Sequence, residues 1–141
     1  MSYQRNNKYK KLEMAEFIIS GTPVVNGYLT LTLVDTNFSA SVSGSGTDTL
    51  ALPTGYYFPR ATCSITRTTA SQNFTFQIEV NNTLGGKRGQ TGWYNNTRSD
   101  YAEHTFKLTS SGNLKIKVGA IETSAPTIVA NSRLWLWRTQ L

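Results

Sequence analysis

The sequence has few of the side chains that build catalytic or metal centres. Among 141 residues it has one histidine, His104, one cysteine, Cys63, and eight acidic residues. A single cysteine excludes an internal disulfide, which argues against a small secreted module held together by disulfides. The acidic residues form no spaced cluster with His104 or Cys63. We therefore expect no catalytic residues, no metal site and no cofactor.

Long apolar segments are also missing. No run approaches the roughly 18 apolar residues of a membrane-spanning helix, so no membrane partner is predicted. The N-terminal stretch MSYQRNNKYKKLEMAEF lacks the apolar core of a signal peptide. Without a signal peptide, we interpret the N-x-S/T triplets that begin at Asn37, Asn73, Asn81 and Asn95 as unmodified.

Charged residues make up only 16% of the chain, and Thr, Ser, Asn and Gly are abundant. A surface solvated by hydroxyls and amides is typical of β-rich extracellular or virion proteins. The formal net charge of +6 permits nucleic acid, an anionic surface or an acidic protein as partner, and it does not choose among them.

Two-residue periodicity predicts an all-β fold. GYLTLTLV (27–34) and QNFTFQIEV (72–80) alternate apolar and polar residues, with Asn73, Thr75, Gln77 and Glu79 expected to face out. A short strand is also expected around Phe38, Ala40 and Val42, and SGSGT (43–47) is expected to be a loop. We predict one jelly-roll-like two-sheet sandwich of about eight to ten antiparallel strands over residues 14–141.

Turn residues predict two hairpins. TLALPTGYY (49–57) is typical of two strands joined at Pro53-Thr54-Gly55, and Pro59 places the second strand at an edge or a bulge. The strands 101–108 and 113–118 are expected to pair through TSSG, with Phe106 and Leu108 opposite Leu114 and Ile116. His104 shares the inward parity of Phe106, which predicts a structural role. Cys63 is expected to be buried.

The first 13 residues form a basic N-terminal arm without a clear period. Two interpretations remain open for it, a solvated frayed end or a segment that orders against an acidic partner. A short helix over 10–17 and a strand over 15–20 are both possible at its end. The basic residues of the arm are Arg5, Lys8, Lys10 and Lys11.

The polar segment 81–100 is expected to be a long exposed loop. Lys87, Arg88, Trp93 and Tyr94 are its candidate contact residues. The aromatic pair could close over the sandwich as a structural lid, stack on a glycan, or stack on bases in an unlikely nucleic-acid complex. The run GGKRG lacks the spacing of a phosphate-binding loop.

The last strand is apolar on both faces. In SRLWLWR (132–138), Leu134 and Leu136 share one face, and Trp135 and Trp137 share the other. A strand on the surface of a monomeric sandwich should have one wet face. The second apolar face therefore predicts a subunit or partner interface at Trp135 and Trp137.

The motifs over residues 47–141 resemble complement- and tumour-necrosis-factor-like jelly rolls of bacteriophage virion proteins. The resemblance rests on TLALPTGYYFPRATCSITR, QNFTFQIEVNNT, HTFKLTSSGNLKIKV and NSRLWLWRTQL. It implies a trimer of ten-stranded sandwiches that serves as a fibre tip or as a head decoration protein. The chain has no stalk, collagen-like or coiled-coil segment, which favours a decoration protein.

Our first hypothesis is a non-enzymatic capsid decoration or cement protein on the outer head surface of a phage. Its partner would be the major capsid protein or another virion protein, and it would be found in the host cytoplasm during assembly. The first alternative is a carbohydrate- or receptor-binding module at a fibre or head-fibre tip, with Trp93 and Tyr94 as platform. The second is a glycan-degrading enzyme that uses Glu79 or Glu103. An acidic cleft beside aromatics would favour the enzyme, and a bare aromatic platform would favour the binding module.

Overall fold

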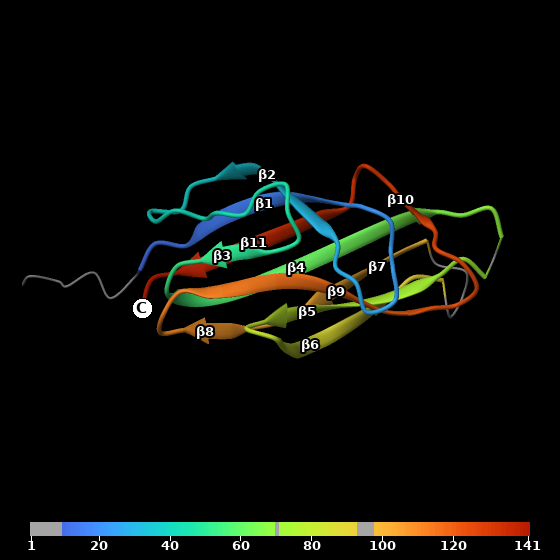
Figure 1. Cartoon of the computed structure of the whole chain (residues 1–141). Helices are drawn as coiled ribbons and strands as arrows, with labels where there is room; N and C mark the ends of the chain where they lie inside the picture. Colours follow the sequence, from blue (N-terminus) through green and yellow to red (C-terminus); the bar gives the residue numbers. More distant parts are fainter. Residues whose placement is uncertain (1–9, 70, 93–97) are drawn as a thin grey trace, which may run out of the picture.

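The computed structural model describes residues 10–69, 71–92 and 98–141, which form an all-β sandwich (Figure 1). It has eleven strands, one more than the upper limit predicted from the sequence. None of the described residues is helical, so that part of the chain holds no helix that could cross a membrane. The strands are β1 (Glu13–Ser20), β2 (Thr30–Thr36), β3 (Leu50–Leu52), β4 (Gly55–Thr66), β5 (Phe74–Val80), β6 (Thr83–Gln90), β7 (Ser99–Glu103), β8 (Phe106–Leu108), β9 (Gly112–Ile121), β10 (Thr127–Ile128) and β11 (Arg133–Thr139).

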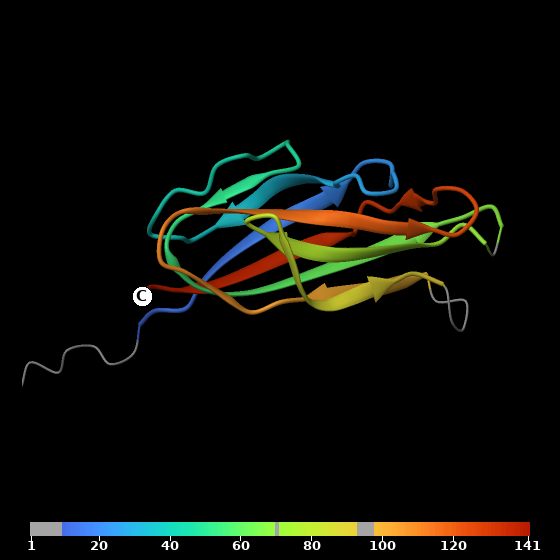
Figure 2. The same ribbon diagram turned by 60° about the horizontal axis from the view of Figure 1, so that its bottom comes forward.

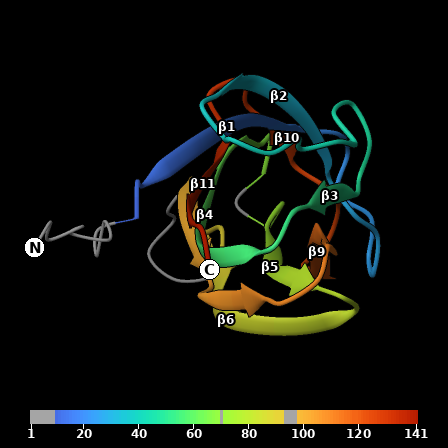
Figure 3. The ribbon, with the colours of Figure 1, turned by 90° about the vertical axis from the view of Figure 1, so that its left-hand side faces the viewer.

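The strands form two layers around one core. Their order is β2-β1-β11-β4-β7-β6-β5-β9-β3, and β8 and β10 also pair with the long strand β4. Because β6 pairs with both β7 and β5, it joins the layers along one side, as the end-on view shows (Figure 3). The first and last strands, β1 and β11, lie side by side in one layer (Figure 2).

Alternating side chains fill the space between the layers. The burial of β1, β4 and β11 alternates along each strand, as half-buried strands require. Cys63 is fully buried, as the sequence predicted, and burial raises the pKa of its thiol far above the ordinary value. The largest fully buried side chains of the core are Tyr57, Phe17, Phe74, Phe76, Ile19, Leu29, Leu31, Leu50, Leu52, Ile78, Leu114 and Ile116.

Both predicted hairpins are wrong, because each connects the two layers instead. β3 pairs with β9 while β4 pairs with β11, so the turn at 53–54 crosses between the layers. β8 pairs with the first residues of β4, and β9 pairs with β5 and β3. Phe106 thus stacks on Tyr57 with ring centroids 5.0 Å apart and does not pair with β9.

Pro59 lies in the interior strand β4 rather than at an edge or a bulge. One side of it pairs with Leu136 of β11. On the other side, its carbonyl accepts a hydrogen bond from the His104 amide at 3.3 Å, where β7 has ended and β8 has not begun. The nitrogen of a strand residue points to the same side as its carbonyl. The missing donor of Pro59 therefore faces this interruption, so the ladder to β11 stays intact.

Two further sequence predictions need correction, and one open alternative is decided. Of the helix over 10–17 and the strand over 15–20, the strand is confirmed, because β1 spans Glu13–Ser20 and none of residues 10–17 is helical. The segment around Phe38 is irregular, although the Phe38 ring packs near Tyr57 with centroids 6.3 Å apart. On β5, the supposedly solvated Thr75 and Glu79 are buried, and so is the adjacent Asn73.

The predicted loop 43–47 covers the open edges of the sandwich. Leu31 of β2 exchanges backbone hydrogen bonds of 2.8 Å with this loop, through the Thr47 carbonyl and the Gly46 amide. Ser43 exchanges two more with Ala51 of β3. Uncovered edge strands tend to pair with other chains, so this loop protects both β2 and β3 from such pairing.

Candidate functional site

The outward face of β11 and its neighbours carries a row of apolar side chains. Leu134 and Leu136 lie in the core, so the alternation of β11 directs Trp135 and Trp137 outward, where both are half-buried. Trp137 pairs with Met14 of β1 on one side and with Phe58 of β4 on the other. Together these three side chains, the rings of Trp137 and Phe58 and the adjoining Met14, are called the aromatic row. Phe58 is 47% exposed.

The charged side chains around the aromatic row are paired with one another. Arg133 contacts Glu16 at 3.2 Å, and Arg60 contacts Glu103 at 3.7 Å. The Arg60 guanidinium also lies 4.0 Å from the centre of the Tyr101 ring. Exposed pairs of this kind add little stability, and they neutralise only the four side chains that form them.

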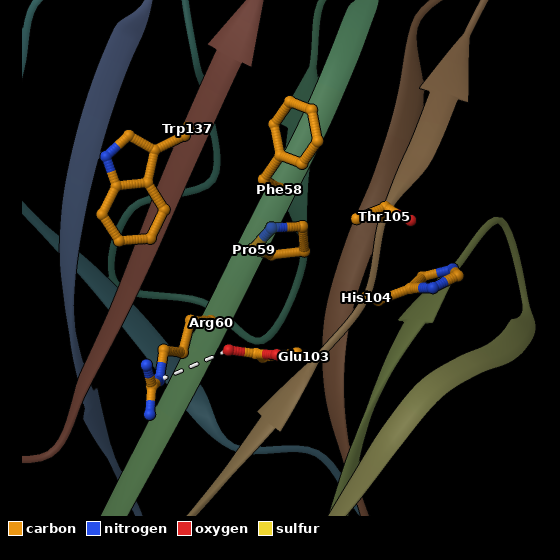
Figure 4. Close-up of a pocket in the computed structure, with 7 residues that line it drawn as sticks. All are labelled: Phe58, Pro59, Arg60, Glu103, His104, Thr105 and Trp137. Atoms are coloured by element: carbon orange, nitrogen blue, oxygen red, sulfur yellow. Dashed lines mark ion pairs between the residues drawn. The ribbon is translucent and has the colours of Figure 1, made fainter.

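A shallow groove of about 280 Å³ opens beside the aromatic row (Figure 4). Trp137, Phe58 and Pro59 form one side of the groove, and Glu103, His104 and Thr105 of the β7–β8 connection form the other. Arg60 reaches across to Glu103. The groove lies at the interruption between β7 and β8, where the His104 amide still bonds to the Pro59 carbonyl of β4.

His104 is among the residues that line this groove, and its side chain has the inward parity of Phe106, as the sequence predicted; the two rings pack with centroids 5.5 Å apart. His104 is half-buried, and burial lowers the pKa of its imidazole. Its ring lies over Gly85, where an added Cβ would come within 2.3 Å of the ring. The sequence predicted a structural role for His104 but not its contact with Gly85. Gly85 is the feature that could have indicated it, since a glycine in mid-strand often marks a close approach.

The predicted long loop over 81–100 is wrong over its first half, where β6 lies. Lys87 turns toward β7, where its ammonium donates to the Tyr101 carbonyl at 2.7 Å and contacts Asp100 at 3.3 Å. Arg88 is exposed. Trp93 and Tyr94 lie outside the described residues, so the predicted partner contact through Lys87, Arg88, Trp93 and Tyr94 stays a prediction.

The described end of the arm is exposed and lies close to the aromatic row. Lys10 and Lys11 are exposed, whereas Arg5 and Lys8 lie outside the described residues. The arm leads into Glu13, and the next residue, Met14, is part of the aromatic row.

The two carboxylates of the glycosidase hypothesis do not face one cleft. Glu79 is buried on β5 beside Tyr28, and hydrogen bonding to its carboxylate raises the pKa of the Tyr28 hydroxyl. Glu103 lies on β7, beyond β6, and contacts Arg60. Within the part of the chain that the structure describes, no three His, Cys, Asp or Glu side chains gather as a metal site.

Solved structures identify the fold. Murine APRIL superimposes with a TM-score of 0.63 at 13% identity, over 91% of this chain and 99% of that one. The chain has a TNF- and C1q-like jelly-roll fold. The globular domain of zebrafish complement 1qA gives a TM-score of 0.60 at 8% identity, over 93% and 97% of the two chains. Eiger TNF from S. frugiperda gives 0.60 at 10% identity, over 92% and 93%.

The structural similarity confirms the jelly-roll part of the sequence resemblance. At these identities the likeness concerns the fold alone. No protein-family model matches the sequence, and no curated protein sequence matches it.

Proposed function

We propose that the protein is a non-enzymatic structural protein of a virion, which assembles as an oligomer, with a trimer favoured. The aromatic row carries this proposal. In it, Trp137 and Phe58 remain accessible on a β-sheet that is already apolar on its inner side. Each such side chain contributes roughly 1.5–3 kcal/mol when it becomes fully buried, so association of copies through this face is favourable.

The role we propose is decoration of the outer head surface of a bacteriophage, as a cement protein. The net charge of +6 and the basic arm with Lys10 and Lys11 suit an acidic surface on the major capsid protein or another virion protein. The arm joins the body beside the aromatic row, so an oligomer would present several arms together. Several weak contacts then combine into firm attachment. Assembly would begin in the host cytoplasm.

Attachment can be tested with phage heads that lack the protein. Exchange of Arg5, Lys8, Lys10 and Lys11 for Gln should abolish attachment while the sandwich stays folded. A control that exchanges Arg98, Lys107, Lys115 and Lys117 for Gln changes the net charge equally and should attach with nearly unchanged affinity. Attachment by the wild type should also weaken as salt rises, because exposed charge contacts are screened. Equal attachment of the arm variant and the wild type would refute the role of the arm.

The groove supports the carbohydrate-binding alternative as a second candidate. It combines the aromatic faces of Trp137 and Phe58 with the polar groups of Glu103 and Thr105, a combination that can hold a sugar ring. This candidate is tested by titrating the protein with a panel of glycans while the NMR signals of the tryptophan indoles are monitored. Saturable shifts of Trp137 in a monomeric protein would favour it over the structural role.

A further inference from the structure

A second row of outward side chains adjoins the aromatic row, at the end of the sandwich where β1 begins and β11 ends (Figure 1). Thr139 of β11 pairs with Tyr56 of β4. Because Glu13 pairs with Arg138, Leu12 comes to lie beside Thr139. Alternation directs the side chains of this row to the same outer face as the aromatic row. The exposed apolar face therefore continues to the point where the arm leaves the body.

Leu12 and Tyr56 are the apolar members of this second row, and they are 56% and 42% exposed. We call these two side chains the arm anchor. Leu141, which is also 42% exposed, lies two residues beyond Thr139 and adds apolar area at the same end. A partner that covers the exposed area of one such side chain gains at least about tenfold in affinity.

The arm places positive charge directly beside the arm anchor. Lys10 and Lys11 are exposed, and neither forms an ion pair with a carboxylate among the described residues. The next carboxylate along the chain, that of Glu13, is buried and paired with Arg138. Residues 1–9 continue from this point and carry two further basic residues and no acidic one. This end of the sandwich thus combines exposed apolar area with unbalanced positive charge.

An acidic protein surface is the partner that suits this end. A second copy would bring its own Lys10 and Lys11 against those of the first, and like charges that face each other across an interface oppose binding. An acidic surface attracts these lysines instead. Apolar side chains within that surface can cover the leucine and the tyrosine of the arm anchor.

We propose that the arm anchor binds the same virion partner as the basic arm and supplies the part of the attachment that salt does not weaken. This inference rests on the proposed attachment to the major capsid protein or another virion protein. Salt screens the charges of the arm, whereas the burial of Leu12 and Tyr56 against apolar side chains is not screened. The arm provides attraction, and the arm anchor fixes the place where the body meets the partner.

Titration of phage heads that lack the protein, at low and at high salt, tests the proposal with the full chain. Leu12→Ser and Tyr56→Ser should each weaken attachment at least about tenfold, by the same factor at every salt concentration. The double change Lys10→Gln and Lys11→Gln should instead lose affinity mainly at low salt and so flatten the salt dependence. Val25→Ser is the matched control and should attach like the wild type. Val25 is 54% exposed and follows the opposite end of β1.

Two further measurements show which contact a variant affects. Far-UV circular dichroism reports whether the sandwich is folded, and sedimentation velocity reports the association state. Leu12 precedes β1, so Leu12→Ser leaves every strand unchanged. Both anchor variants should keep the fold and the association state of the wild type, because the aromatic row is intact. An anchor variant that dissociates the oligomer would assign Leu12 and Tyr56 to the contact between copies and overturn the proposal.

The outcomes separate this inference from the proposed function. Unchanged attachment of both anchor variants, with attachment still lost when the four basic residues of the arm are exchanged, overturns the arm anchor alone. A loss of affinity in the anchor variants that disappears at high salt also overturns it, because apolar contacts are not screened. Attachment that does not depend on the charges of the arm overturns the proposed attachment, whatever the anchor variants do.

Discussion

Arg138 and Glu13 form a buried ion pair that fastens the last strand of the sandwich to the first. The Arg138 Nη1 and Glu13 Oε2 atoms lie 2.5 Å apart, and the two side chains are 5% and 2% exposed. Arg138 also donates to the Thr54 carbonyl, and the other Glu13 oxygen accepts the Ser39 amide at 3.0 Å. The pair thus connects β1, β11, the 53–54 turn and the irregular segment at Ser39.

Glu13→Gln should destabilise the fold strongly, because it leaves the Arg138 guanidinium buried without a counter-charge. Loss of one partner of a buried pair costs about 3–5 kcal/mol. Glu16→Gln is the matched control, since Glu16 and Arg133 form a partly exposed pair on the same two strands. The control should cost less than about 1 kcal/mol. Urea unfolding measures both, and equal losses for the two variants would contradict the role given to the buried pair.

The same pair should make the fold sensitive to acid. Burial alone would raise the pKa of Glu13, but hydrogen bonds from Ser39 and Arg138 outweigh burial and hold the pKa below its ordinary value of 4.5. A carboxyl with a lowered folded-state pKa stabilises the fold above its ordinary pKa. That stability is lost as the pH falls from 4.5 through the folded pKa. Below pH 4.5, the stability difference between wild type and Glu13→Gln should therefore shrink.

Gly89→Ala should destabilise the sandwich by about 1–3 kcal/mol, because the Phe76 ring occupies the space of a side chain at this position. An added Cβ would lie 2.3 Å from Cζ of Phe76. If this glycine only provided loop flexibility, the change would instead be neutral or stabilise by about 0.4–1 kcal/mol. The sign of the change in urea unfolding decides between the two roles.

Tyr57→Phe should lower stability by about 1–3 kcal/mol, because it leaves the Pro53 carbonyl without its donor. The Tyr57 hydroxyl donates to that carbonyl at 2.6 Å in a fully buried position. Burial raises the pKa of Tyr57 from 10.0 to about 12. An acidic group with a raised folded-state pKa makes the fold lose stability as the pH rises from 10.0 toward 12. Spectrophotometric titration should show a tyrosine that ionises near pH 12 in the wild type and is missing from the variant.

Local sequence patterns predicted the strands better than their partners. Alternation placed Phe74, Phe76 and Ile78 in the core correctly, because every second side chain of a strand points to the same face. The same patterns cannot tell a hairpin from a crossing between layers. The pairing of β8 with β4 depends on Phe106 stacking on Tyr57, a contact between segments that lie far apart in the sequence.

The candidate site was predictable only in part. The alternation within residues 132–138 predicted that Trp135 and Trp137 face away from Leu134 and Leu136, and in the structure they do. The groove was not predictable, because Phe58, His104 and Trp137 come from three separate segments. The glycines at 85 and 89 were interpreted as features of a loop. In the structure they lie beneath the rings of His104 and Phe76, and composition alone cannot show such a close approach.

The oligomeric state of Trp137→Arg compared with wild type tests the central claim most directly. The matched control is Leu84→Arg, which changes an exposed apolar side chain on β6, outside the aromatic row. Sedimentation equilibrium should show an oligomer for the wild type and the control. Trp137→Arg should shift toward monomer, because about 2–3 kcal/mol of tryptophan burial is lost at each contact. A monomeric wild type, with both Trp135 and Trp137 quenched by iodide in the free and the assembled protein alike, would contradict the account.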